Sequence, residues 1–424
     1  MCLACCCSLD LLYLCDCMYS LGPIPSIRLK GSLNLPVSKS IANRLLILQA
    51  LQGQALYPYD AAWSNDVKCL HQHLSHQSTE YDFKDAGTPL RLFLAYAAFK
   101  GIDGVVLGSK RLSERPIKAL LKSLEILGAE FEFLEQAYQL PLRVKKAVNR
   151  QATTTQIEVH ESSQFLSALL LIAPYFEHGL VINCIGQAVS SSYTKLTQQC
   201  LKSIAKIEQL KPEQIQVSAR NLFADDLPKT IEADWSSAAF VLAWAALSEQ
   251  AEISLPNLTL SSAQGDAVIA QYMKAWGVHC ADSPVGLKVF KTQGAAIEST
   301  LLHFDLTSTP DLFPVLLALC AVSQRQVVFS GLAHQIHKES NRLQAMLSNL
   351  APYGLSYDLS ADAQTLKVTH GVNPNPLFQV KAFNDHRIIM ACSVLAFVGQ
   401  VQLDAIEDVS KSFPDFFDKI KTLY

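Results

Sequence analysis

Residues 236–247, SSAAFVLAWAAL, open with two serines and continue without a single charged side chain. Serine is a favoured N-cap, so this composition predicts a helix that begins at the serines. A helix that is apolar on every side must be surrounded by protein or by lipid. Since the stretch is shorter than the ~20 residues that a membrane-spanning helix needs, we expect a helix buried in the core of a globular domain.

The same design, small or polar residues followed by a dense apolar run, occurs six times along the chain. The runs start at residues 40, 88, 163, 236, 309 and 387, so successive starts are 73 to 78 residues apart except for a first interval of 48. In most units an amphipathic helix and a short alternating strand follow, as in residues 116–133. Mixed units of this length fit small α/β subdomains rather than a solenoid. We therefore predict an α/β (α+β) fold with two pseudo-symmetric domains of three units each.

The composition excludes several classes of protein. Of the 424 residues 50% are hydrophobic and 17% are charged, and the formal net charge is -3. A disordered chain would have a much smaller fraction of apolar residues and a larger fraction of charged residues. A dedicated nucleic-acid binder would show an excess of basic residues, and every uncharged apolar run is too short to cross a bilayer. We expect neither nucleic acid nor a membrane as a partner.

The twelve cysteines fall into two groups, because six lie within the first 17 residues and six are scattered singly. The N-terminal group lacks the basic start of a signal peptide and lacks the paired C-x2-C spacing typical of zinc sites. A metal site there is conceivable, but we interpret residues 1–22 as a non-native or disordered extension. The scattered cysteines resemble small buried hydrophobes in a reducing compartment, so we predict a cytoplasmic location.

The functional signal lies in the cations near the helix starts. A cation at a helix N-terminus faces the positive end of the helix dipole, which is unfavourable unless an anion compensates it. Any one of these residues alone would be an ordinary surface charge or ion pair, but their repetition predicts a cleft for anionic ligands. The set comprises Lys39, Arg44, Arg91, Arg115, Lys338, Arg342, Arg387 and Lys411.

Eight short motifs resemble, in the same order, those of the enolpyruvyl transferase family, in the branch that acts on shikimate 3-phosphate. The resemblance extends from about residue 27 to 417. It implies an inside-out barrel fold with two domains, each of three βαβαββ units, a discontinuous one of residues 23–36 plus 233–424 and another of residues 37–232. The motifs are Ser38-Lys39-Ser40 with Arg44, Ala86-Gly87-Thr88 with Arg91, Glu114-Arg115-Pro116, Ser162-Ser163-Gln164, Pro310-Asp311, Lys338-Glu339 with Arg342, Asn384-Asp385-His386-Arg387, and Lys411.

The resemblance implies transfer of the enolpyruvyl group of phosphoenolpyruvate to the 5-hydroxyl of shikimate 3-phosphate, with release of inorganic phosphate, by a monomer without metal or cofactor. One alternative is the sister reaction on UDP-N-acetylglucosamine, which is disfavoured because residues 105–116 contain no cysteine. A second alternative is a non-catalytic anion-binding relative. Val37 and Asp85, which replace the family's usual Gly and Asn, support that alternative, whereas the intact Asp311, Glu339 and Lys338 count against it.

The resemblance also assigns roles to individual residues. The catalytic candidates are Asp311 as the base for the 5-hydroxyl, Lys338 and Glu339 for proton transfer at the methylene carbon, and Lys39, which is expected to touch both substrates. The shikimate 3-phosphate candidates are Lys39, Ser40, Arg44, Ser162, Ser163, Gln164, Ser190, Tyr193, Asp311 and Lys338. The phosphoenolpyruvate candidates are Lys39, Gly87, Arg115, Gln164, Arg342, Arg387 and Lys411. His386 and Arg91 are expected to orient the site, and His334 stands about where the family has a substrate-contacting Asn.

Overall fold

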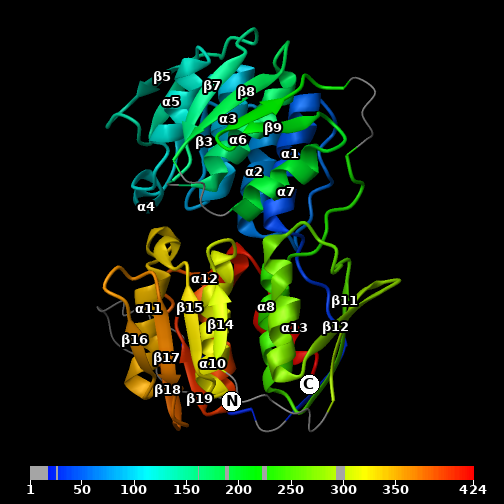
Figure 1. The fold of residues 1–424 in the computed structure, drawn as a ribbon, viewed down its shortest axis with the longest axis vertical. Helices are drawn as coiled ribbons and strands as arrows, with labels where there is room; N and C mark the ends of the chain where they lie inside the picture. Colours follow the sequence, from blue (N-terminus) through cyan, green and yellow to red (C-terminus); the bar gives the residue numbers. More distant parts are fainter. Residues whose placement is uncertain (1–17, 25–26, 161, 187–190, 222–226, 293–300) are drawn as a thin grey trace, which may run out of the picture.

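The computed structural model describes residues 18–24, 27–160, 162–186, 191–221, 227–292 and 301–424. Figure 1 shows two lobes stacked along the long axis of the molecule. We call the described part of residues 38–231 the upper lobe, and the described part of residues 18–36 and 233–424 the lower lobe. Each lobe has its own hydrophobic core.

The upper lobe contains seven helices, one 3-10 turn and eight strands within the described residues. They are α1 (Lys39–Gln52), α2 (Asn65–Ser75), β3 (Glu80–Asp82), α3 (Gly87–Lys100), β4 (Val105–Leu107), α4 (Lys110–Ser113), α5 (Lys118–Ile126), β5 (Glu130–Phe133), β6 (Leu142–Lys146), β7 (Thr154–Glu158), α6 (Ser163–Ile172), η1 (Ala173–Tyr175), β8 (Leu180–Ile185), α7 (Ser191–Leu201), β9 (Ile207–Lys211) and β10 (Gln214–Val217).

The lower lobe combines two N-terminal strands with the C-terminal half of the chain. Its strands are β1 (Tyr19–Leu21), β2 (Arg28–Ser32), β11 (Gln250–Pro256), β12 (His279–Ser283), β13 (Gly286–Lys291), β14 (Leu302–Asp305), β15 (Val327–Ser330), β16 (Ser356–Leu359), β17 (Leu366–His370), β18 (Leu377–Val380) and β19 (Gln400–Leu403). Its helices are α8 (Trp235–Leu247), α9 (Ile269–Tyr272), α10 (Phe313–Val322), α11 (Arg342–Leu350), α12 (His386–Cys392) and α13 (Phe416–Lys421). Its 3-10 turns are η2 (Gly265–Val268), η3 (Met273–Trp276), η4 (Pro310–Leu312), η5 (Ala333–His337), η6 (Ala351–Tyr353), η7 (Ser393–Phe397) and η8 (Ile406–Lys411).

Four of the expected units carry a four-stranded sheet of the same mixed type. The orders are β3-β4-β6-β5, β7-β8-β10-β9, β2-β11-β13-β12 and β14-β15-β17-β16, each with one parallel pair followed by antiparallel pairs. The remaining sheet has three strands, β1-β19-β18. The first unit differs from the expectation: the described residues between α1 and α2 form no strand. Its short interval of 48 residues leaves no length for the missing strands.

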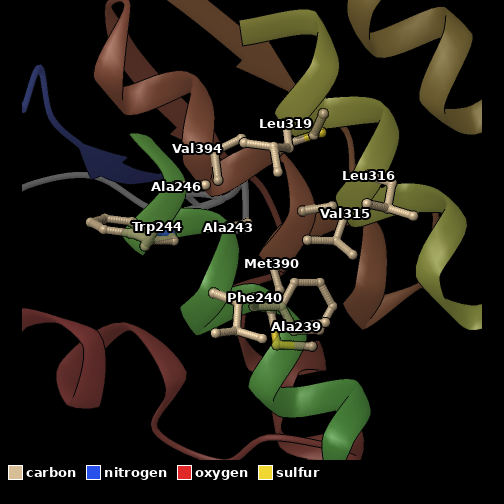
Figure 2. Close-up of a cluster of buried hydrophobic side chains, with 14 of the residues drawn as sticks. Ala239, Phe240, Ala243, Trp244, Ala246, Val315, Leu316, Leu319, Met390 and Val394 are labelled. Atoms are coloured by element: carbon tan, nitrogen blue, oxygen red, sulfur yellow. The ribbon is translucent and has the colours of Figure 1, made fainter. Parts of the chain in front are cut away.

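The buried helices are where the composition predicts them. Every residue of α10 is buried, and α8 exposes at most part of two residues at its ends. Figure 2 shows how α8, α10 and α12 bring Phe240, Trp244, Leu316 and Met390 together in the core of the lower lobe. A helix that contacts protein on all sides needs no polar face, which explains the apolar excess of the chain. Within the described residues no helix is both long and apolar enough to cross a membrane.

The interpretation of residues 1–22 as an extension is wrong for its last residues. Tyr19–Leu21 form β1, which pairs antiparallel with β19. Leu21 is buried, and the ring of Tyr19 lies 4.8 Å from that of Phe417. The backbone pairing and the apolar contacts therefore place these residues in the lower lobe. Residues 1–17, with the six N-terminal cysteines, lie outside the described residues.

The chain passes between the lobes at two adjacent points. Val37 forms a β-bridge with Ala233, and the Asp234 amide donates to the Pro36 carbonyl at 2.9 Å. Val37 does not have a positive φ, so the side chain that replaces the family's glycine is accommodated without backbone strain. We propose the domain boundaries at these paired segments, after residues 36 and 232.

Candidate active site

The first turns of six buried segments converge between the lobes, as expected from the sequence. A cavity of about 130 Å³ lies there. It is lined from the upper lobe by Lys39, Ser40, Thr88, Arg91, Arg115, Ser162, Ser163, Gln164 and Tyr193, and from the lower lobe by Asp234, Ser236, Asp311, His334, Lys338, Glu339, Arg342, Arg387 and Ser412. A larger neighbouring cavity of about 980 Å³ shares Arg115 and Glu339 and contains Lys411.

Asp311 lies at the centre of the cations. Its Oδ1 accepts from Arg342 Nη1 at 2.7 Å and lies 3.2 Å from Lys338 Nζ. Its Oδ2 accepts from Tyr193 Oη at 2.8 Å and lies 3.3 Å from Arg387 Nη2. Burial alone would raise the pKa of Asp311, but Arg387, Lys338 and Arg342 together hold that pKa well below its usual range. The carboxylate is therefore ionised and sits where several cations can also meet a bound anion.

Arg342 connects the carboxylates of the lower lobe. Its guanidinium reaches Asp385 Oδ2 at 2.8 Å and Glu339 Oε2 at 2.6 Å, besides the contact with Asp311. Its side chain is only 1% exposed. A buried guanidinium with three carboxylate partners is fixed in position by charge-assisted hydrogen bonds. Asp385 also caps α12, because its side chain accepts from the Arg387 amide.

Two predicted proton-transfer residues have displaced pKa values. Burial lowers the pKa of Lys338, and the attraction of Asp311 only partly opposes that shift. Burial would raise the pKa of Glu339, but Arg342, Lys411 and Arg115 hold it well below its usual value. Lys338 therefore loses its proton more readily than a free lysine, and Glu339 is ionised near neutral pH.

Lys39 is the first residue of α1, after the N-cap Ser38. Its Nζ lies 3.1 Å from Asp66 Oδ2, a carboxylate on α2 that sequence reasoning missed. Burial lowers the pKa of Lys39, but Asp66 and Glu339 more than reverse that effect, so the pKa is raised. Asp66 is one of the first-turn residues of an amphipathic helix, where an acidic residue normally stabilises its own helix, so its contact with the cleft left no signal in the sequence.

Arg44 does not line the cavity, although the resemblance predicts that it binds substrate. It is completely buried, and its guanidinium donates to Thr197 Oγ1 at 2.7 Å, to Gln164 Oε1 at 3.2 Å and to the Ser40 carbonyl at 2.7 Å. In this structure Arg44 hydrogen-bonds to Ser40 and Gln164, which line the cavity, and does not line it itself. Its direct contact with substrate stays a prediction.

Gly87 begins α3 and lies against the guanidinium of Arg115. A Cβ on Gly87 would come within 2.7 Å of Arg115 Cζ, so only glycine permits this approach. Asp85, two residues earlier, accepts from Ser109 Oγ at 2.5 Å. The extra carboxylate is thus tied to the N-cap of α4 and lines the larger cavity rather than the smaller one.

The remaining predicted residues have these positions. Arg91 lines the cavity and donates to the Pro116 carbonyl at 3.1 Å, which fits an organising role. His386 is completely buried at the start of α12, and burial holds its pKa well below the usual value, so the ring is neutral. Ser190 lies outside the described residues. Sequence reasoning also missed Asp234 and Ser236, although both stand at the start of the quoted segment 236–247 or directly before it.

The family model of EPSP synthase (3-phosphoshikimate 1-carboxyvinyltransferase) matches residues 63–420. The chain belongs to the EPSP synthase family. It is 31% identical over 398 residues to a 3-phosphoshikimate 1-carboxyvinyltransferase of Bacteroides fragilis, covering 93% of this chain and 95% of the relative. A relative of the same name from Methanosarcina acetivorans is 30% identical over 420 residues, again with 93% and 95% coverage.

The fold agrees with that of a solved EPSP synthase. The structure of EPSP synthase from Acinetobacter baumannii superposes with a TM-score of 0.73 at 18% identity, covering 96% of this chain and 98% of that one. The matching relatives are named as an enzyme, 3-phosphoshikimate 1-carboxyvinyltransferase, so this chain is a member of an enzyme family. Within the described residues, no group of three or more His, Cys, Asp or Glu side chains is arranged to hold a metal ion.

Proposed function

We propose that the cleft transfers the enolpyruvyl group of phosphoenolpyruvate to the 5-hydroxyl of shikimate 3-phosphate. The observation that carries the proposal is the single carboxylate of Asp311 within reach of three cations, Arg342, Lys338 and Arg387. Two substrates that each bear a phosphate and a carboxylate repel one another strongly in a closed site. A cluster of buried cations offsets that repulsion and can hold both substrates in a reactive orientation.

The residues of the cleft fit an addition followed by an elimination. A proton is added to C3 of phosphoenolpyruvate, and the 5-oxygen forms a bond to C2 as its own proton leaves. Loss of a proton from C3 then expels inorganic phosphate from C2 and restores the double bond. The proton gained by C3 is lost again, and the proton of the 5-hydroxyl ends on the released phosphate, so the reaction balances.

Asp311 is the proposed acceptor of the hydroxyl proton. Before substrate binds, its cations stabilise the carboxylate and make it a weak base. Anionic substrate groups that draw those cations away would raise the pKa of Asp311 when a base is needed. Lys338, whose pKa burial lowers, is the proposed proton donor at C3, with Glu339 beside it.

The remaining contacts are assigned from the motifs, and Ser190 among them lies outside the described residues. Lys39, Ser40, Ser162, Ser163, Gln164, Ser190 and Tyr193 are proposed for shikimate 3-phosphate, and Gly87, Arg115, Arg342, Arg387 and Lys411 for phosphoenolpyruvate. We also propose that the enzyme acts as a monomer in the cytoplasm. The free thiols of the six cysteines among the described residues fit a reducing compartment.

The test follows phosphate release from purified protein with both substrates and with each one alone. Release only when both are present is expected. Asp305→Asn, which removes an exposed carboxylate of the same lobe, is the matched control for Asp311→Asn and should retain the activity. Folded protein that releases no phosphate with saturating substrates would exclude the reaction and favour a non-catalytic anion-binding relative.

A further inference from the structure

Asp266 lies in η2, beside the candidate active site but outside its lining. Asp266 lines a small cavity of about 20 Å³. The same small cavity is lined by Ser40, Tyr193, Asp234 and Ser236, which also line the cavity of about 130 Å³ around Asp311. The preceding Gly265 lies so close to the upper lobe that a Cβ there would come within 2.7 Å of Ser192 Cβ. Asp266 is therefore held where the two lobes meet.

The contact that matters is with Ser236. The hydroxyl of Ser236 donates to Oδ2 of Asp266, so the hydroxyl proton points away from the cleft while Asp266 is ionised. Ser236 is half-buried and lines the same cavity as Asp311 and Arg387. A hydroxyl has one proton, so Ser236 cannot donate to Asp266 and to a bound anion at the same time.

The ionisable groups around Asp266 come from four segments of the chain. They are Asp234 before α8, Asp311 in η4, Arg387 in α12 and the hydroxyl of Tyr193 in α7. The pKa of Asp266 is raised to about 6: burial is the largest cause, Asp311 and Asp234 act in the same direction, and Arg387 and the hydrogen bond from Ser236 oppose them. An additional anion in the cleft would act in the same direction as the two carboxylates and favour protonation.

We propose that Asp266 is a positioning residue that takes up a proton when an anionic substrate binds and so reverses the hydrogen bond to Ser236. The protonated carboxyl donates to Ser236 Oγ, and the released hydroxyl proton is donated to a phosphate or carboxylate oxygen of the substrate. No bond other than that of the transferred proton changes, and the proton comes from water. The inference rests on the proposed function for the identity of the substrate, but the linkage applies to any phosphate-bearing ligand of this cavity.

The test measures the affinity for shikimate 3-phosphate and for inorganic phosphate between pH 6.5 and 8.5. Above the pKa of Asp266, uptake of one proton weakens binding by about tenfold per pH unit in addition to the titration of the ligand itself. Asp266→Asn keeps a permanent donor toward Ser236, so this additional slope should disappear and affinity at pH 8 should exceed that of the unmodified enzyme by at least tenfold. Glu252→Gln, an exposed carboxylate on β11, is the matched control and should keep the slope.

Ser236→Ala separates this role from a structural one. It should weaken binding at every pH and also remove the additional slope, because the donated proton no longer exists. Calorimetry of the unmodified enzyme at pH 8, in two buffers of different ionisation enthalpy, should show uptake of close to one proton, and this arm does not depend on any variant folding.

Equal slopes in the unmodified enzyme and Asp266→Asn, or no proton uptake at pH 8, would overturn the inference. Failure of shikimate 3-phosphate to bind would instead count against the proposed function. The inorganic phosphate arm would still decide the role of Asp266 in that case.

Discussion

Arg342 donates from Nη1 to Oδ1 of Asp311 at 2.7 Å, so the proposed base and a proposed cation of the substrate clamp are bonded to each other before any substrate enters. The same guanidinium also holds Asp385 and Glu339. Without substrate, this cation of the cleft is therefore paired with carboxylates of the protein itself. Substrate anions can replace those carboxylates as partners, which couples binding to the basicity of Asp311.

Asp311→Asn should reduce kcat by a factor of ~10²–10⁴, the usual contribution of a positioned acid or base. Affinity for shikimate 3-phosphate should be retained or increased, because three cations lose a competing carboxylate. Steady-state kinetics combined with direct binding measurements separate the two effects. A normal kcat would show that another group takes the hydroxyl proton.

Arg342→Ala should destabilise the fold by about 3–5 kcal/mol, because it leaves buried carboxylates without their counter-ion. Chemical denaturation gives the change in the free energy of unfolding. Arg111→Ala removes an exposed arginine whose pair with Glu114 lies in solvent, and it should change stability by less than about 1 kcal/mol. Similar losses for the two variants would mean that Arg342 is not the anchor of the carboxylate cluster.

Gly87→Ala should raise KM for phosphoenolpyruvate by about tenfold or more, since its methyl group would displace the Arg115 guanidinium. KM for shikimate 3-phosphate should change much less. Initial-rate kinetics with each substrate varied in turn checks the difference. An unchanged KM for phosphoenolpyruvate would separate Arg115 from binding of that substrate.

Leu316→Ala should cost about 2–5 kcal/mol of stability, because the side chain is completely buried among the helices of the lower core. Figure 2 shows this residue on α10. Leu359→Ala, at a position 40% exposed on β16, is the control and should cost far less. Thermal or urea unfolding of both variants provides the comparison, and equal costs would contradict the buried-helix arrangement.

Stability should fall in acid. The folded pKa values of Asp311 and Glu339 lie well below their ordinary values of about 4, so the stabilisation is present above pH 4 and is lost as the pH falls through the folded pKa values. Unfolding free energies measured from pH 7 down to pH 3 should show this loss. Glu339→Gln should reduce the change in unfolding free energy with pH. An unchanged pH dependence in this variant would show that Glu339 does not contribute to the acid sensitivity.

Much of the fold was predictable because its signal is local. The apolar segments that start at residues 40 and 309, for example, coincide with α1 and with η4 plus α10. The strand Tyr19–Leu21 was missed because its pairing partner, Gln400–Leu403, lies nearly 400 residues away, and three residues carry no periodicity of their own. A contact made only through tertiary structure leaves no pattern in the sequence around it.

The site, too, was predictable where its residues belong to local motifs and not where their roles depend on tertiary packing. Motifs located Lys39, Asp311 and Arg342 in one cavity, but they could not show that Arg44 lies behind it. The distinction between touching a ligand and supporting a neighbour depends on side-chain packing, which the motif does not contain. Asp266 was missed for a related reason, since its significance comes from Ser236, 30 residues earlier.

The central claim is that this cleft joins the enolpyruvyl group to shikimate 3-phosphate rather than merely binding or hydrolysing anions. The most direct measurement is mass spectrometry of the product together with phosphate release in the same reaction. We expect one 5-enolpyruvylshikimate 3-phosphate for each phosphate released, and a fall of both rates by the same factor of ~10²–10⁴ in Asp311→Asn. Phosphate released together with pyruvate, without the enolpyruvyl product, would contradict the account.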